Sequence, residues 1–203
     1  MTTLLRTKFR RERNKALKLL KPPPKLNIAE WANSHRYLAR GTSAEAGKFD
    51  TDRLPYQREP MESLTDPATA STVLMWGAQM GKTEVLLNTI GYFIDAQPAP
   101  MLIVYPTLDV SRKFSQKKLT PMLEESPRIK DAVRDPRTRD SGNTILSKEF
   151  RGGSLVVAGS NSPASLRQLS CRVIVQDEID SFEPSAGAEG DPCFLADARA
   201  TNF

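Results

Sequence analysis

Cysteine and histidine are scarce in this chain, which has two cysteines and one histidine among its 203 residues. Two cysteines cannot form a disulfide framework or a cysteine zinc site, and the single histidine, His35, gives no basis for a serine–histidine triad. No apolar run reaches the roughly 20 residues of a membrane helix, and the basic N-terminus lacks the apolar stretch of a secretory signal. These absences favour a cytoplasmic protein in a reducing compartment, with no membrane partner for its domain.

Acidic residues are nearly missing from the N-terminus, where residues 1–25 hold nine basic side chains and one acid, Glu12. The rest of the chain has 20 basic and 23 acidic residues, so the net charge of +5 comes from this tail. A basic tail suits nucleic acid, an acidic partner or a membrane surface; a solvated segment without a specific partner is the alternative. Pro22, Pro23 and Pro24 form a stiff linker, so we expect a tail at 1–25 and one domain at 26–203.

Apolar runs of strand length alternate with segments of helical length after residue 71. Buried strands are predicted at 72–76, 101–105, 154–158 and 172–176, because these runs are short, apolar and bounded by turn residues. Longer helices are predicted at 83–94 and 108–124, and a short one at 27–37 with Asn27 as its N-cap. This alternation predicts an α/β fold with a parallel sheet flanked by helices.

A glycine-containing loop joins the first of these strands to the first long helix, which is the context of a phosphate-binding P-loop. Backbone N–H groups of residues 78–83 and the helix dipole would bind phosphate oxygens, Lys82 would contact the β- and γ-phosphates, and Thr83 would ligate Mg²⁺. The first glycine stands at 77, whereas the usual pattern places it where this chain has Trp76. A glycine turn with an incidental lysine is the alternative. The predicted nucleotide-binding residues are Gly77, Ala78, Gln79, Met80, Gly81, Lys82 and Thr83.

Two adjacent acids, Asp177 and Glu178, follow the strand predicted at 172–176. Ligands of open α/β sheets bind outside the carboxyl ends of the strands, so Asp177 should lie beside the loop and hold Mg²⁺. Glu178 would act as the general base that polarises the attacking water. The two side chains of adjacent strand residues point in different directions, which suits two roles. The alternative is a solvated strand end.

Four further residues are candidates for contacts with a nucleotide. Gln57 could pair with both edges of adenine and Tyr56 could stack on it, although an ordinary turn explains this segment equally well. Arg167 and Arg172 precede the acidic strand, and an arginine near the γ-phosphate can stabilise the transition state.

Taken together, these stretches resemble the large terminase subunit of tailed phages, in particular the lambda-type family. The resemblance rests on LPYQREPME at 54–62, MWGAQMGKTEVLL at 75–87, VYPT at 104–107 and AGSNSPASLRQLSCRVIVQDEIDS at 158–181. It implies a P-loop NTPase fold of the RecA-like (ASCE) type and an ATPase that powers DNA packaging into a procapsid, with ATP and Mg²⁺ as cofactors. It also associates Tyr56 and Gln57 with adenine and makes Arg167 the best match to an arginine finger.

The same resemblance implies partners and a longer protein. The expected partners are double-stranded DNA, the terminase small subunit, the procapsid portal and further copies of the chain in a ring, all in the host bacterial cytoplasm. Family members continue into a metal-dependent nuclease, and their next strand lies between the P-loop strand and the acidic strand. Because this sequence stops at Phe203, we expect an incomplete ATPase sheet without the nuclease domain, weak nucleotide binding at most, and neither packaging nor cutting of DNA.

Two rival functions share parts of this pattern. A helicase-type ATPase has the same P-loop and acid pair, but it needs arginine-bearing motifs in a second RecA-like domain, and residues 1–203 show none. A non-catalytic fragment would keep only the basic tail and partner binding. Replacement of Lys82 by alanine would discriminate, since a real site would change its nucleotide binding.

Overall fold

The computed structural model describes residues 10, 13, 25–41, 45–133, 142–167 and 169–201 of the chain. The predicted basic tail and proline linker lie outside these residues, apart from Arg10, Arg13 and Lys25, so the tail stays a prediction. In the part of the chain that is described, no helix has the length and apolar character to cross a membrane.

A four-stranded sheet forms the centre of the molecule, with the strand order β4-β5-β3-β6. β3 (Met101–Tyr105) pairs in parallel with both β5 (Gly153–Gly159) and β6 (Val173–Gln176). β4 (Ser147–Phe150) runs antiparallel to β5 at one edge. The predicted α/β fold and its parallel strands are therefore confirmed, with the addition of one antiparallel edge strand.

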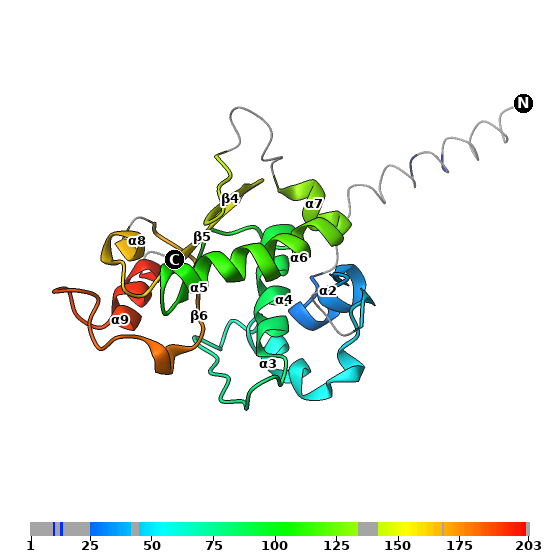
Figure 1. Ribbon diagram of the computed structural model, residues 1–203. Helices are drawn as coiled ribbons and strands as arrows, with labels where there is room; N and C mark the ends of the chain where they lie inside the picture. Colours follow the sequence, from blue (N-terminus) through cyan, green and yellow to red (C-terminus); the bar gives the residue numbers. More distant parts are fainter. Residues whose placement is uncertain are drawn as a thin grey trace, which may run out of the picture.

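Helices cover both faces of this sheet because the side chains of β3 alternate between two apolar clusters. Met101, Ile103 and Tyr105 enter the larger cluster, whereas Leu102 and Val104 enter the smaller one. In Figure 1 the helices of the larger cluster lie to the right of the sheet and in front of it, and α8 and α9 lie to its left. The first group comprises α2 (Ile28–His35), α4 (Lys82–Asp95), α5 (Leu108–Phe114), α6 (Thr120–Glu125) and α7 (Pro127–Ala132); the second comprises α8 (Pro163–Arg167) and α9 (Pro192–Asp197).

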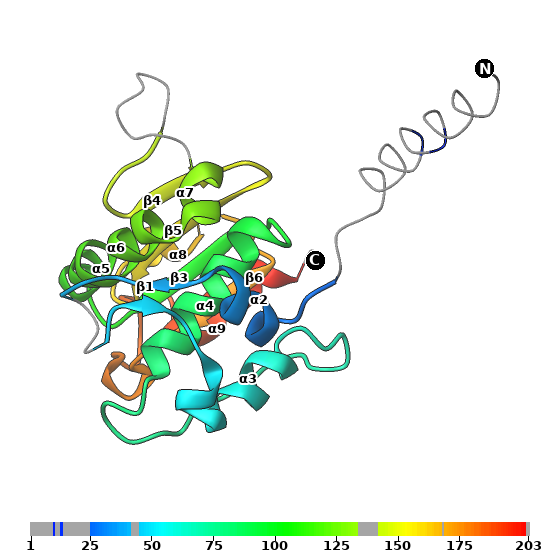
Figure 2. The ribbon, with the colours of Figure 1, turned by 90° about the vertical axis from the view of Figure 1, so that its right-hand side faces the viewer.

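The segment before the loop packs against α4. Asn27 caps α2 in a capping box with Glu30, as the sequence predicts. Trp31 of α2 is 1% exposed, and its indole N–H donates to Asp95 at the end of α4 over 2.8 Å. Figure 2 shows α2 beside α4. The shorter elements are β1 (Tyr37–Leu38), β2 (Gly47–Lys48), α3 (Arg58–Ser63) and the 3-10 turns Thr51–Arg53, Pro55–Gln57, Ile179–Ser181 and Ala198–Ala200.

The helix predicted at 108–124 is interrupted by a π-helical stretch, Ser115–Leu119, between α5 and α6. Pro121 has no N–H, and its ring crowds the carbonyl group four residues earlier. A local widening of the helix accommodates both effects, which explains why the wide turn directly precedes this proline.

The strand predicted at 72–76 is absent from the sheet, so that prediction is wrong. Residues 71–77 form no ladder with another described strand. Leu74 and Trp76 pack against the larger cluster, whereas Val73 is 76% exposed and Met75 is 92% exposed. The apolar run has the composition of a strand buried on both faces, but it pairs with no described strand, and its alternate residues Val73 and Met75 face solvent.

Candidate functional site

The loop at 77–83 leads into α4 through Gly81, which has φ +80° and lies in the left-handed region. Glycine adopts this conformation without the steric cost of a Cβ atom. The hydrogen bonds of the described residues leave the N–H groups of residues 78–83 without an acceptor. Unpaired N–H groups at the positive end of a 14-residue helix are the groups that bind phosphate oxygens in other proteins.

The side chains at the start of α4 have contrasting contacts. The Lys82 ammonium donates to the Trp76 carbonyl over 2.8 Å, so the lysine reaches back to the residue that precedes the loop. The Thr83 hydroxyl has no hydrogen-bond partner among the described residues. It therefore remains available as an oxygen ligand of the kind that Mg²⁺ prefers.

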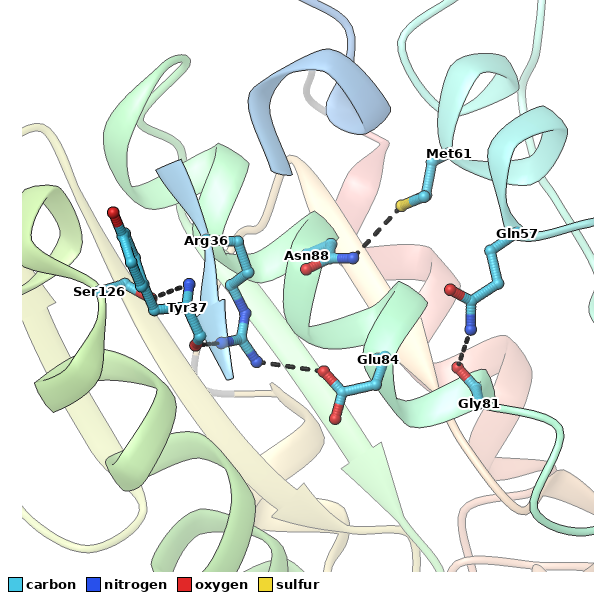
Figure 3. A network of polar contacts seen from close by, with 8 residues as sticks. All are labelled: Arg36, Tyr37, Gln57, Met61, Gly81, Glu84, Asn88 and Ser126. Atoms are coloured by element: carbon cyan, nitrogen blue, oxygen red, sulfur yellow. Dashed lines mark hydrogen bonds and ion pairs between the residues drawn. The ribbon is translucent and has the colours of Figure 1, made fainter. Parts of the chain in front are cut away.

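The Tyr56–Gln57 segment holds the loop from outside. The Tyr56 hydroxyl donates to the Met80 carbonyl over 3.1 Å, and its ring meets the Trp76 ring edge-on at 5.2 Å between centroids. The Gln57 amide is 1% exposed and donates to the Gly81 carbonyl over 3.1 Å (Figure 3). Both residues thus bind backbone carbonyls of the loop, a role that the sequence analysis did not foresee.

The acidic pair lies at the carboxyl end of β6, as predicted. Its first residue, Asp177, is half-buried, and its N–H donates to the Val104 carbonyl of β3 over 3.1 Å. The Tyr105 hydroxyl donates to one carboxylate oxygen of Asp177 over 3.2 Å, and the N–H of Glu178 donates to the other over 3.0 Å. Burial, followed by the Asp177 charge, raises the pKa of Tyr105, so this phenol remains a hydrogen-bond donor.

Glu178 is exposed and has φ +56°. The two acids differ in surroundings because β6 ends at Gln176 and the chain turns at Glu178, and not because of strand alternation as the sequence suggested. Gln79 in the loop has φ +58°, and these two are the only non-glycine residues with positive φ in the described chain. Such strained conformations cluster at functional sites.

No hydrogen bond or ion pair joins the loop at 77–83 to Asp177 or Glu178 within the described residues. Arg167, at the end of α8, forms an exposed ion pair with Glu189. The structure therefore gathers Tyr56, Gln57 and the loop in one group and Asp177 with its neighbours in another, while Arg167 is engaged elsewhere.

Two residues near these groups were missed by the sequence analysis. The sheet register explains why Tyr105 reaches Asp177: Val104 pairs with Gln176, so the next residues of the two strands lie side by side. A tyrosine at the end of a strand parallel to the acidic strand was the signal that could have predicted this contact. Arg36 is buried against Glu84 of α4, and no local pattern in the sequence indicates that contact.

The donor set determines which metal could fit. In the described chain no cluster of three or more histidine, cysteine, aspartate or glutamate side chains could hold a metal by itself. Thr83 and Asp177 each carry an oxygen of the kind that Mg²⁺ prefers, and no contact among the described residues joins the two side chains.

Comparison with known proteins gives a consistent result. The family described as "Phage terminase large subunit gpA, ATPase domain" matches residues 43–203. The large terminase subunit of Enterobacteria phage P21 is 29% identical over 184 residues, which cover 90% of this chain and 28% of that protein. The large terminase subunit of Escherichia phage lambda is 26% identical over 182 residues, covering 89% of this chain and 28% of that protein. This chain therefore spans about a quarter of the length of these relatives, and it belongs to the family of the phage terminase large subunit gpA ATPase domain.

Proposed function

We propose that this chain is the ATP-binding and ATP-hydrolysing part of a terminase large subunit that drives DNA packaging into a procapsid. The observation that carries the proposal is the loop before α4, whose N–H groups at 78–83 have no acceptor. The chain also belongs to a family of ATPase domains. The fold would then be of the P-loop type. Neither a helicase-type ATPase nor a non-catalytic fragment is favoured by the family to which the chain belongs.

Each site residue has a proposed role. The N–H groups from Ala78 to Thr83 would bind the phosphates, and the Lys82 ammonium would exchange the Trp76 carbonyl for the β- and γ-phosphates. Thr83 and Asp177 would hold Mg²⁺, which when bound neutralises charge on those phosphates. Glu178, exposed beside Asp177, would accept a proton from the attacking water.

Two assignments need a rearrangement. Arg167 can act as an arginine finger only after it leaves Glu189. Gln57 would have to leave the Gly81 carbonyl to read adenine, whereas Tyr56 is 40% exposed and can offer a ring face to the base. Both assignments stay predictions.

The partners belong to the complete protein. We propose double-stranded DNA, the terminase small subunit, the portal and a ring of identical subunits, acting in the host cytoplasm. The basic residues at 1–25 are the proposed contact for the small subunit or for DNA.

Titration of the purified chain with a fluorescent ATP analogue and Mg²⁺, at protein concentrations up to the millimolar range, tests the proposal. We expect weak saturable binding that Lys82→Ala removes, because the ammonium supplies the charge for the phosphates. Lys130→Ala, which changes an exposed lysine on α7, is the matched control and should bind like the wild type. Equal binding by the wild type and Lys82→Ala would refute the proposed site.

A further inference from the structure

A buried arginine lies beneath the first turn of α4. Arg36 follows α2 and is 2% exposed. Its guanidinium donates to the Glu84 carboxylate over 3.2 Å and to the carbonyl of Tyr37, as Figure 3 shows, while its Nε atom is buried without a partner. The Tyr37 N–H donates to the Ser126 hydroxyl over 3.2 Å, which fixes this segment from the other side.

Stability alone does not account for this arrangement. Burial lowers the pKa of Arg36, and the Glu84 charge only partly opposes that effect. Taking a guanidinium and a carboxylate out of water costs free energy that their attraction often fails to recover, and apolar residues of similar volume are frequently as stable. Glu84 keeps 25% of its side chain exposed, so most of this cost falls on the buried Arg36, whose unsatisfied nitrogen suggests a task other than holding the fold together.

The position of Glu84 indicates what that task is. Glu84 is the third residue of α4 and directly follows Lys82 and Thr83. An acid in the first turn of a helix interacts favourably with the helix dipole, but it repels a polyanion that binds at the same turn. A unit charge at about 10 Å from a phosphate changes binding by roughly 2- to 15-fold over the range of dielectric found near protein surfaces. An unpaired Glu84 would therefore oppose the ligand that the loop is proposed to bind.

We propose that Arg36 is a positioning residue that neutralises the Glu84 carboxylate and holds this side chain away from the phosphates that would bind at the first turn of α4. This inference rests on the proposed function, since it concerns the same turn of α4. Arg36 touches no nucleotide in this scheme. It acts through Glu84, from the segment between α2 and β1, and it sets the charge of the turn that receives a nucleoside triphosphate.

The test compares ATP, ADP and AMP binding by the chain and its variants, in Mg²⁺ at low salt. Arg36→Met keeps the side-chain volume but leaves the Glu84 charge unpaired. We expect it to weaken ATP binding about 10-fold, ADP binding less and AMP binding least, because the repulsion grows with the charge of the ligand. Glu84→Gln should tighten ATP binding about 2- to 5-fold, since the positive charge of Arg36 remains. The double variant should return close to the wild type.

Arg128→Met is the matched control, because it breaks an ion pair of 2.9 Å with Asp95 at the opposite end of α4. It should leave the three affinities unchanged. Equal weakening of ATP, ADP and AMP by Arg36→Met would overturn the inference, as would a double variant that does not recover, because either result describes a purely structural residue. If Arg36→Met does not fold, Glu84→Gln decides alone: tighter ATP binding supports the inference, and unchanged or weaker binding overturns it. Absence of ATP binding by the wild type would refute the proposed function first, and this inference with it.

Discussion

Replacement of Gly81 by alanine tests whether Gln57 holds the phosphate loop as closely as the structure shows. Gly81 has φ +80°, and a Cβ atom at this position would come within 3.0 Å of the Gln57 amide nitrogen. That nitrogen belongs to a side chain that is 1% exposed and donates to the Gly81 carbonyl. Alanine therefore meets two obstacles, one in its own backbone conformation and one in its neighbour.

The two costs can be assigned separately. A residue with a Cβ atom in the left-handed region costs about 1–2 kcal/mol. Displacement of the Gln57 amide removes a hydrogen bond worth about 1 kcal/mol. The expected loss in the free energy of unfolding is therefore about 2–3 kcal/mol, or roughly 4–12 °C in melting temperature for a domain of this size.

Gly187→Ala isolates the backbone cost. Gly187 has φ +62°, and the nearest atom to its added Cβ would be in Pro163 at 3.7 Å, which is ordinary contact. This variant should lose only about 1–2 kcal/mol. Urea unfolding followed by tryptophan fluorescence measures both variants, because Trp31 is 1% exposed in the folded chain.

A double variant completes the comparison. Gln57→Ala removes the obstructing amide, so adding Gly81→Ala to it should cost less than Gly81→Ala does in the wild type. Equal losses for Gly81→Ala and Gly187→Ala would show that Gln57 does not crowd the loop. A Gly81→Ala variant as stable as the wild type would refute the whole argument, including the strained backbone.

Three further predictions concern a helix packing contact, a helix cap and the hydrogen bond to Asp177. Gly91→Ala should destabilise the chain by about 1–2 kcal/mol in urea, although alanine favours a helix by about 1 kcal/mol, because its Cβ atom would come within 3.0 Å of the Trp31 ring; a stabilised variant would contradict this packing. Asn27→Ala should lower the free energy of unfolding by about 1 kcal/mol through loss of the α2 cap, and thermal melts that overlay the wild type would contradict it. Tyr105→Phe should raise the Mg²⁺ concentration for half-maximal nucleotide binding by about 3- to 10-fold, because the Asp177 carboxylate loses a donor, and an unchanged Mg²⁺ requirement would show that this hydrogen bond does not matter.

Local patterns were sufficient for elements whose ends carry their own signals. Asn27 caps α2 because its side chain accepts from the Glu30 N–H, an interaction within three residues. β3 occupies 101–105 as predicted, since five successive apolar residues buried on both faces match a central parallel strand. The placement of Asp177 at a strand end follows from the same kind of local reasoning.

Such local patterns could not predict contacts between distant segments of the chain. The run at 72–76 has the composition of β3, yet Val73 and Met75 face solvent because no described strand pairs with it. Whether an apolar run is buried depends on its neighbours, which the run does not specify. The Gln57–Gly81 contact spans 24 residues, and only the folded chain shows that this amide binds the loop.

The sequence by itself determined the α/β class of the fold, the span of β3, the capped start of α2 and the position of the acid pair after a strand, because short-range periodicity and capping residues encode them. The tertiary structure alone decided that Tyr105 donates to Asp177 and that Arg36 is buried against Glu84 across 48 residues. These contacts depend on sheet register and on the packing of α2 against α4. Both are properties of the whole fold, since they arise from many apolar contacts acting together.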